Sequence, residues 1–218
     1  MKGGKRMSSN AANTSVADAV PAPDSTAKRL TGDERRREIL DAVRTVSSEL
    51  GVSHLSVSAV AKRAGCTRSL FYHYFEDKEA VADAVLDNVI DEILTTLKQW
   101  NQARETGNVN KALDDIVHVL RSLIADESPF SNRMIQDGNA ELYIKFIDRA
   151  ADRIADYIAQ TTVRDFEQMH GLPITNVHET FFTLIVGLIS LIRSHPNISD
   201  RTIKEVMAQT LHIESYVV

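Results

Sequence analysis

One short stretch of the chain gathers side chains that can recognise nucleic-acid bases. Residues 64–80 have the sequence AGCTRSLFYHYFEDKEA, in which a tight turn at Gly65 leads into a helix of about two turns. We expect Leu70, Phe71 and Phe75 to point toward a core. The side chains left for the outer face are polar or aromatic: Arg68, Ser69, Tyr72 and His73. Because a guanidinium group can donate two hydrogen bonds to O6 and N7 of guanine, the pattern predicts base recognition in a major groove, with Arg68 as the base-reading residue.

Three short helices must position this face. Apolar residues at i, i+3 and i+4 spacing predict the first helix over 33–50. Ser56 and Thr67 are predicted N-caps of the next two helices, over 57–64 and 68–74. A helix, a glycine turn and a second helix with a polar outer face form a helix-turn-helix, whose second helix fits the width of the major groove. The sequence therefore predicts a compact DNA-binding module.

The order of these residues resembles the DNA-binding domain of the TetR family of transcriptional repressors. The resemblance covers about residues 33–82 and is carried by RREILDAVRTVSSELGVSHLSVSAVAKRAGCTRSLFYHYFEDKEAV. It rests on an ordered set: IL.A in the first helix, Gly51, Ser56, AVAKRAG in the second helix, Tyr72, YF at Tyr74 and Phe75, and KE at Lys78 and Glu79. The chain departs from the family at Phe71, where leucine is usual, and at Cys66, where valine is common. Both differences exchange one apolar residue for another, so the expected fold is unchanged.

The resemblance implies a homodimer whose third helix reads DNA and whose fourth helix begins with a lysine that contacts phosphate. Matched by position, the implied contacts are Ser56 or Ser58 on the DNA backbone, then Thr67, Arg68, Ser69, Tyr72 and Tyr74 from the third helix, and Lys78. His73 is added because we expect it to point outward. The alternative for Tyr72 and Tyr74 is that they pack the module and leave one hydroxyl in water. Cys66 is interpreted as a small buried hydrophobe, the alternative being a redox sensor.

Charge is distributed unevenly along the chain. The net charge is −5, which by itself disfavours a nucleic-acid partner. Residues 28–78 nevertheless hold ten Lys or Arg against seven Asp or Glu, a charge of +3, whereas residues 79–218 hold twelve against twenty-one, a charge of −9. A mildly basic unit joined to an acidic one is expected if only the first unit meets phosphates.

The fold is predicted to be all-α, because strand-type alternation is absent from the sequence. We expect a disordered tail over 1–32, a three-helix helix-turn-helix DNA-binding domain over 33–78, and a larger helical effector-binding and dimerisation domain over 79–218. The helices predicted for the larger domain cover 78–102, 109–125, 130–137, 139–160 with an extension toward Met169 allowed, 176–194 and 199–215. An arm that reaches a minor groove is the alternative for the basic residues of the tail: Lys5, Arg6, Lys28 and Arg29.

The penultimate helix has apolar residues on two faces. In HETFFTLIVGLISLIRSHP one face holds Phe181, Leu184, Ile185, Leu188 and Ile192, and the other holds Phe182, Val186 and Ile189. A helix that is apolar all round must be buried all round, and a twin subunit is the simplest cover for the outer face. The predicted dimer interface comprises Val186, Gly187, Ile189, Val206 and Thr210. The resemblance adds a four-helix bundle made by the last two helices of each subunit, and a monomer core is the alternative.

The larger domain also offers candidates for an effector pocket. Apolar walls with a few polar tips suit a small organic ligand. The candidates are Trp100, His118, Phe130, Met134, Tyr143, Phe146 and Phe182. For His118 the alternative is a core histidine paired to a neighbour.

Several classes of function are disfavoured. There is no GxSxG, P-loop or GxGxxG motif, and HETFF at His178 is not HExxH, so we expect no enzyme. The histidines lack the spacing of a metal clamp and there is one cysteine, so we expect neither a metal nor another cofactor. The apolar run over 181–192 is shorter than the roughly 20 residues that cross a bilayer, and the N-terminus lacks a secretory signal. A reducing cytoplasm fits best.

Together these features predict a cytoplasmic homodimer that binds a pseudo-palindromic operator in double-stranded DNA. The expected role is that of a repressor released by a small organic effector. The alternative is an architectural or assembly-factor DNA-binding protein of the same fold that has no effector.

Overall fold

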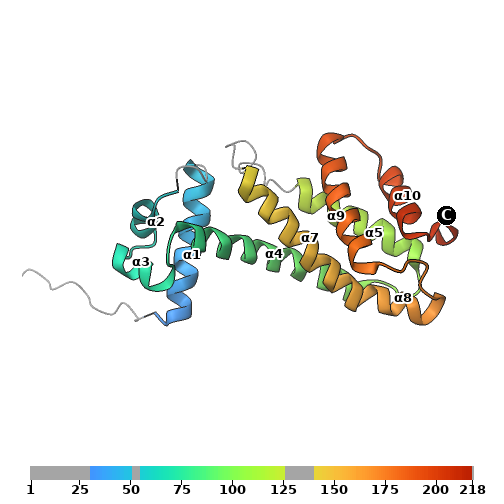
Figure 1. The fold of residues 1–218 in the computed structure, drawn as a ribbon, viewed down its shortest axis with the longest axis horizontal. Coiled ribbons are helices and arrows are strands. Elements are labelled where there is room, and N and C mark those ends of the chain that lie inside the picture. Colours follow the sequence, from blue (N-terminus) through green and yellow to red (C-terminus); the bar gives the residue numbers. More distant parts are fainter. Residues whose placement is uncertain (1–29, 51–54, 126–139, 218) are drawn as a thin grey trace, which may run out of the picture.

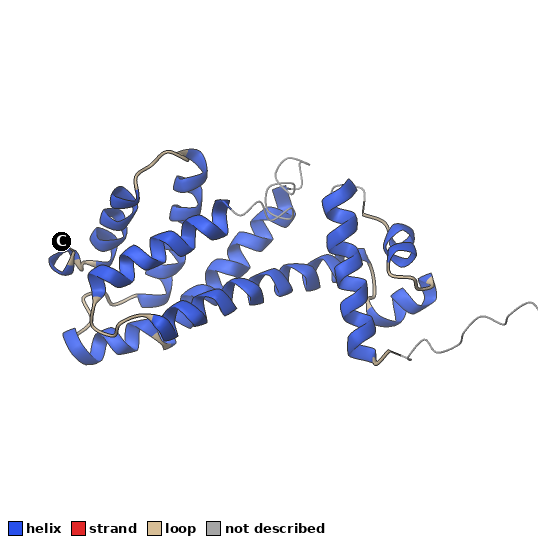
Figure 2. Ribbon diagram, turned by 180° about the vertical axis from the view of Figure 1, so that it is seen from behind, coloured by secondary structure: helices blue, strands red, loops and turns tan. Residues whose placement is uncertain are grey.

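Every regular element in the described part of the chain is a helix. The computed structural model describes residues 30–50, 55–125 and 140–217. The elements are α1 (Gly32–Leu50), α2 (Val57–Arg63), α3 (Arg68–Tyr74), α4 (Lys78–Ala103), α5 (Val109–Ala125), α7 (Ala140–Gln160), α8 (Thr162–His170), α9 (Val177–Ser194), α10 (Asp200–Leu211) and a 3₁₀ turn (Glu214–Tyr216). Figure 2 shows these helices joined by loops, with no strand in these ranges, and the all-α prediction is confirmed. The predicted helix over 130–137 and residues 1–29 of the predicted tail lie outside the described residues.

The helix predicted to extend toward Met169 is two helices. α7 ends at Gln160 and α8 begins at Thr162. Between them Thr161 has φ −125° and ψ −83°, and its hydroxyl donates a 2.7 Å hydrogen bond to the carbonyl oxygen of Tyr157. A hydroxyl bonded to the preceding turn, followed by further β-branched residues, weakens a helix at this point.

The last helix ends earlier than predicted. α10 stops at Leu211 because His212 adopts left-handed dihedral angles, φ 55° and ψ 41°. The N–H of His212 bonds to the carbonyl oxygens of Ala208 and Gln209. The left-handed residue that ends a helix is usually glycine or asparagine, so the sequence carries no recognisable stop signal here.

α1, α2 and α3 pack into an N-terminal module around one small core. Its buried side chains are Ile39, Leu40, Val43, Val60, Phe71 and Phe75. The Ser56 hydroxyl accepts a 3.2 Å bond from the Ala59 amide at the start of α2, and the Thr67 hydroxyl accepts a 3.1 Å bond from the Leu70 amide at the start of α3. Gly65 makes the turn between them with φ +60°, where another residue would be strained. Both predicted caps and the predicted glycine turn are confirmed.

α4 joins the N-terminal module to the larger domain. It begins at Lys78 beside α1 and runs to Ala103 near α8 and the start of α5 (Figure 1). Its 26 residues span about 39 Å. α7 and α9 pack along each other, and α5 and α10 complete the larger domain around them. α4 therefore has one end at the module and the other deep in the larger domain.

A row of ion pairs fastens α4 to α7. Asp83, Asp87 and Asp91 follow one another every four residues, so they lie on one face of α4. Arg149 on α7 lies 3.4 Å from Asp83 and 3.2 Å from Asp87, and Arg153 lies 2.6 Å from Asp91. These side chains are partly exposed, so each pair contributes little to stability. Together, as the α4–α7 ion-pair row, they specify the register of the two helices.

Removing the N-cap of α4 should destabilise the junction between the two domains. Asp77 accepts a 2.7 Å hydrogen bond from the amide of Ala80. Asp77→Ala should lower the free energy of unfolding by about 1 kcal/mol, measured by urea denaturation. Asp77→Asn keeps an acceptor at the same place and should lose much less. Equal losses in the two variants would show that the capping bond contributes nothing.

Candidate nucleic-acid interface and ligand cavities

The inner face of α3 anchors the N-terminal module, and its outer face is exposed. Phe71 is 0% exposed, whereas its neighbour Tyr72 is 54% exposed. Arg68, Ser69 and His73 are exposed as well. Within the described ranges the guanidinium group of Arg68 has neither an ion-pair nor a hydrogen-bond partner. Its donors are therefore available, in the arrangement that matches a guanine edge.

The two tyrosines of α3 are placed differently. Tyr72 extends from the module, with its ring 5.5 Å from that of Phe71 in an edge-on contact. Tyr74 is half-buried, packs against the core, and has its hydroxyl beside Gly32 at the start of α1. The packing alternative therefore suits Tyr74, and the outward alternative suits Tyr72.

The other predicted DNA contacts lie near helix starts. Ser56 and Thr67 are exposed while their hydroxyl oxygens accept the capping bonds, and Ser58 is exposed in the first turn of α2. Lys78 is exposed as the first residue of α4, and no carboxylate of the described residues lies within ion-pair distance of it. A free ammonium group at the positive end of a long helix can bind a phosphate.

Two ion pairs that the sequence did not indicate brace the N-terminal module. Arg63 on α2 donates to both carboxylate oxygens of Glu49 on α1, at 2.8 and 3.3 Å. Arg44 on α1 donates to Glu92 on α4 at 2.8 Å. Partners this far apart in sequence meet only through tertiary packing, so helical periodicity could not reveal them. The pair between Arg44 and Glu92 ties the orientation of the module to that of α4.

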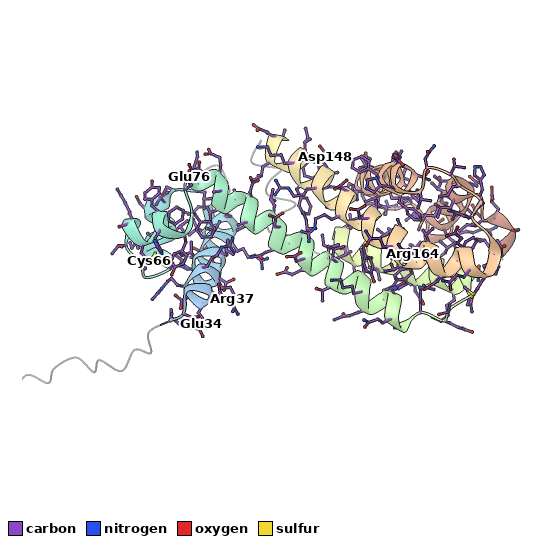
Figure 3. The ribbon with its side chains drawn as sticks, turned by 60° about the horizontal axis from the view of Figure 1, so that its bottom comes forward. Glu34, Arg37, Cys66, Glu76, Asp148 and Arg164 are labelled. Atoms are coloured by element: carbon purple, nitrogen blue, oxygen red, sulfur yellow. The ribbon has the colours of Figure 1, made fainter. Side chains whose placement is uncertain are left out.

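Cys66 lies in the turn that leads into α3, close to α1 (Figure 3). Partial burial raises the pKa of its thiol, and the nearby Arg35 opposes this effect. A thiol that stays protonated is a weak nucleophile. The placement supports the interpretation of Cys66 as a small apolar residue of the module.

Two adjoining cavities lie in the larger domain. The central cavity, of about 320 Å³, lies between α4, α5, α7 and α9. The distal cavity, of about 140 Å³, lies at the end of α4 far from the module, among α4, α5, α8 and α10. The two cavities share wall side chains: Ile116, Ile158, Phe181 and Met207. Phe181, which the sequence placed on the core face of its helix, is thus an aromatic wall of both.

The predicted pocket residues divide between several places. Trp100 lines the distal cavity and Phe146 lines the central one. Tyr143 and Phe182 line neither cavity, and the Tyr143 hydroxyl instead accepts a 3.3 Å hydrogen bond from Arg193. Two candidates lie outside the described residues: Phe130 and Met134.

His118 is a surface residue. Its side chain is 73% exposed, and its Nδ1 lies 3.9 Å from a carboxylate oxygen of Asp200. The adjacent Ile116 and Val117 are buried, so α5 directs the histidine away from the core. The apolar context IVHVL indicated burial, but the histidine falls on the outer side of the helix. It belongs to neither cavity wall, and it is not a core histidine.

Comparison with known proteins identifies the family of the N-terminal module. Residues 39–85 match the family described as bacterial regulatory proteins, tetR family. The HTH-type transcriptional regulator BetI of Klebsiella pneumoniae (strain 342) is 26% identical over 83 residues, which are 38% of this chain and 43% of BetI. The chain therefore matches less than half of that relative's length. The N-terminal module is a TetR-family DNA-binding module.

Solved structures share the fold of this chain beyond the module. A putative transcriptional regulator from Pseudomonas aeruginosa PAO1 has a TM-score of 0.59 and 15% identity, covering 86% of this chain and 90% of its own. RolR in complex with the ligand resorcinol has a TM-score of 0.55 and 17% identity, covering 84% of this chain and 91% of its own. At these identities the likeness concerns the fold, and the predicted class of a helix-turn-helix domain followed by a larger helical domain is confirmed.

The predicted dimer positions lie on α9 and α10. Gly187 and Thr210 are exposed, and Val186 and Val206 are half-buried. Ile189 lines the central cavity, because it follows the cavity residue Ile185 by one helical turn. Ile189 is half-buried and faces the central cavity within one subunit, and its place in the dimer interface stays a prediction.

Among the helices of the described residues, α9 alone is long and apolar enough to cross a membrane. A core helix of a soluble protein passes the same test of length and composition. α9 packs against α7, α10 and α5, with its inner side chains buried: Leu184, Ile185, Leu188 and Ile192.

Proposed function

We propose that this protein is a homodimeric, cytoplasmic transcriptional repressor that binds a pseudo-palindromic operator in double-stranded DNA. The outer face of α3 carries the proposal, because Arg68 and Tyr72 are exposed there while Phe71 fixes the helix in the module core. Residues 33–78 would contact the operator, and residues 79–218 would dimerise and bind an effector. The description of BetI as a transcriptional regulator supports the same role.

A small organic effector would release the protein from its operator. Two cavities with apolar walls support this part of the proposal, as does the fold neighbour RolR, which was solved with resorcinol. α4 would transmit the effect, since it has Lys78 at one end and Trp100 in a cavity wall near the other. An effector shifts operator affinity only if it binds the two conformations of the protein unequally.

Selection of bound sites from random DNA at two salt concentrations tests the proposal. A palindromic consensus with two half-sites is the expected result, because each half-site would meet one α3 of the dimer. Binding that depends steeply on salt but yields no consensus would contradict a regulator and favour the architectural role. With an operator in hand, reciprocity gives a second check, because operator DNA must weaken effector binding by the factor with which the effector weakens operator binding.

Loosening the α4–α7 ion-pair row should weaken operator binding. Arg149→Met removes the contacts to Asp83 and Asp87, so α4 is held less firmly against α7 in the free protein. Fixing α4 when the dimer binds DNA then costs conformational entropy that the unmodified protein does not lose. We expect operator affinity to fall about two- to fivefold at fixed salt, measured by fluorescence anisotropy. Lys145→Met is the matched control, because Lys145 pairs with Glu141 on the same helix. Equal losses in both variants would show that only the charge of α7 matters, and not its link to α4.

A further inference from the structure

We infer that Arg36, in the first turns of α1, binds a backbone phosphate of the DNA, separate from the phosphate expected at Lys78. The inference rests on the proposed function, because it adds a contact to the proposed DNA interface. Arg36 would extend that interface to α1, a helix that neither the outer face of α3 nor the position of Lys78 assigns to DNA.

Arg36 is held over the end of α3 by an aromatic ring. Its guanidinium carbon lies 5.0 Å from the centre of the Phe75 ring, which is the range of a cation–π contact. Phe75 is 4% exposed, so the ring is fixed by the module core. Arg36 precedes the buried residues Ile39 and Leu40 by three and four positions, which places it on the core-facing side of α1. α1 therefore directs Arg36 across the edge of the core toward α3.

This contact places a positive charge at the junction between α3 and α4. Phe75 is the C-cap of α3, and Lys78 is the first residue of α4. The Tyr74 hydroxyl lies beside Gly32, so the start of α1 meets the same junction. Arg36 and Lys78 are both exposed there. Two cations from two different helices thus lie at one edge of the N-terminal module.

The end of α3 is also where the DNA backbone is expected. Seven residues make α3 about 10.5 Å long, and the major groove is about 12 Å wide. When a helix of this length fills the groove, groups just beyond its ends lie next to the two sugar–phosphate backbones that border the groove. The guanidinium group of Arg36 is such a group, because it lies over the ring of the residue that ends α3.

The charge of Arg36 is available for a phosphate. Within the described ranges its guanidinium group has neither an ion-pair nor a hydrogen-bond partner. Glu38, two residues further along α1, is paired with Arg35 at 2.7 Å. Glu76, beside Phe75, is exposed and does not pair with Arg36. Neither carboxylate therefore competes for Arg36 through a bond that DNA would have to break.

Glu34, the acidic residue two positions before Arg36, is turned back to the start of its own helix. Its carboxylate accepts a 2.8 Å hydrogen bond from the amide of Thr31, and the Thr31 hydroxyl accepts a 3.3 Å bond from the amide of Glu34. The bond from the Thr31 amide lowers the pKa of the Glu34 carboxyl. This reciprocal capping engages the carboxylate and leaves Arg36 without a partner.

A guanidinium group over a ring can still bind an anion. The ring meets the face of the group, whereas the N–H donors lie in its plane. Those donors match the oxygens of a phosphate, which a guanidinium group can bind through two parallel hydrogen bonds. The ring also restricts the side chain before DNA arrives, so less side-chain entropy is lost on binding. Arg36 is therefore suited to hold a phosphate and to pack against α3 at the same time.

Salt-dependent binding of the full-length protein to a DNA duplex of mixed sequence tests the inference. Arg36→Met keeps an apolar stem over Phe75 but removes the charge. It should reduce the magnitude of the slope of log affinity against log salt by about 0.9, the contribution of one phosphate contact. This corresponds to about a fivefold loss of affinity at about 0.15 M salt relative to 1 M. Arg36→Lys keeps the charge and should keep the slope. Fluorescence anisotropy over a range of salt concentrations measures both quantities.

Two further variants separate a specific contact from a general effect of charge. Arg37→Met removes the same charge from the next residue of α1 (Figure 3), which is exposed and points about 100° away around the helix. It should change the slope by less than half as much as Arg36→Met does. The double variant Arg36→Met/Lys78→Ala should reduce the slope by about 1.8, because the two side chains would bind different phosphates.

Each outcome supports or overturns the Arg36 contact. An affinity loss in Arg36→Met that leaves the slope unchanged would assign Arg36 a packing role only and overturn the contact. Equal slope changes in Arg36→Met and Arg37→Met would overturn it as well. A double variant with no larger effect than Lys78→Ala alone would show that the two side chains share one phosphate. Circular dichroism shows whether each variant is folded, and Arg36→Gln replaces Arg36→Met if the latter unfolds.

The same titrations keep the Arg36 contact and the proposed function apart. The test duplex contains no operator, so the salt slope reports the phosphate contact whether or not a consensus can be selected. Failure to select an operator would overturn the proposed regulator, whereas a normal selection with an unchanged slope in Arg36→Met would overturn only the Arg36 contact. No binding of the unmodified protein to either DNA would overturn both.

Discussion

Val186→Glu should convert the protein into monomers and lower its affinity for a palindromic operator on the order of 100-fold or more. Val186 is half-buried on α9 beside the exposed Gly187, on the face that the sequence assigns to the dimer. Covering that face with a second subunit would bury the new carboxylate without a partner, which costs several kcal/mol. A monomer binds one half-site at a time, and it loses the gain from linking two modules about 34 Å apart. Sedimentation velocity and fluorescence anisotropy measure the two effects.

A glutamate on another exposed apolar position is the matched control for this prediction. Ile144 on α7 is 57% exposed, and Ile144→Glu should leave the protein dimeric. Circular dichroism should show that both variants keep their helices. If Ile144→Glu gives monomers and Val186→Glu does not, the dimer forms through α7, and the outer face of α9 has another role.

The N-terminal module was predictable because local rules determine it. Ser56 and Thr67 are caps by residue type and spacing, and Gly65 supplies a turn that other residues resist. The division of α3 into a face with Phe71 and a face with Tyr72 follows from the helical repeat alone. Such features involve residues close in sequence, so periodicity and capping reveal them.

The larger domain was less predictable, because its features depend on which helices meet. His118 sits in an apolar sequence but points outward, and Ile189 turns toward a cavity that forms only when α4, α5, α7 and α9 assemble. The break at Thr161 and the left-handed His212 lack the usual glycine or proline signals. The indole Nε1 of Trp100 is buried without a partner among the described residues, and no spacing in the sequence encodes it.

Arg68→Ala should lower affinity for the selected operator about 5- to 150-fold and relax the preference at one base position of each half-site. The guanidinium group is exposed on α3 and has no partner among the described residues, so its removal should leave the module folded. The loss should appear on the cognate site and much less on random DNA, because a base contact discriminates between sequences whereas a phosphate contact does not. An unchanged base preference would show that α3 is oriented differently on DNA.

Lys78→Ala should have the opposite signature, which makes the pair of variants decisive for the orientation of the N-terminal module. As the exposed first residue of α4, Lys78 can neutralise one phosphate, but we do not expect it to contact a base edge. Loss of the Lys78 side chain should weaken binding to all DNA sequences to a similar extent. It should also reduce the magnitude of the slope of log affinity against log salt by about one. Arg63→Ala is the control for a lost positive charge, because Arg63 is engaged by Glu49. If Arg63→Ala changes the salt slope as much as Lys78→Ala, the contact of α4 with phosphate is only a general charge effect.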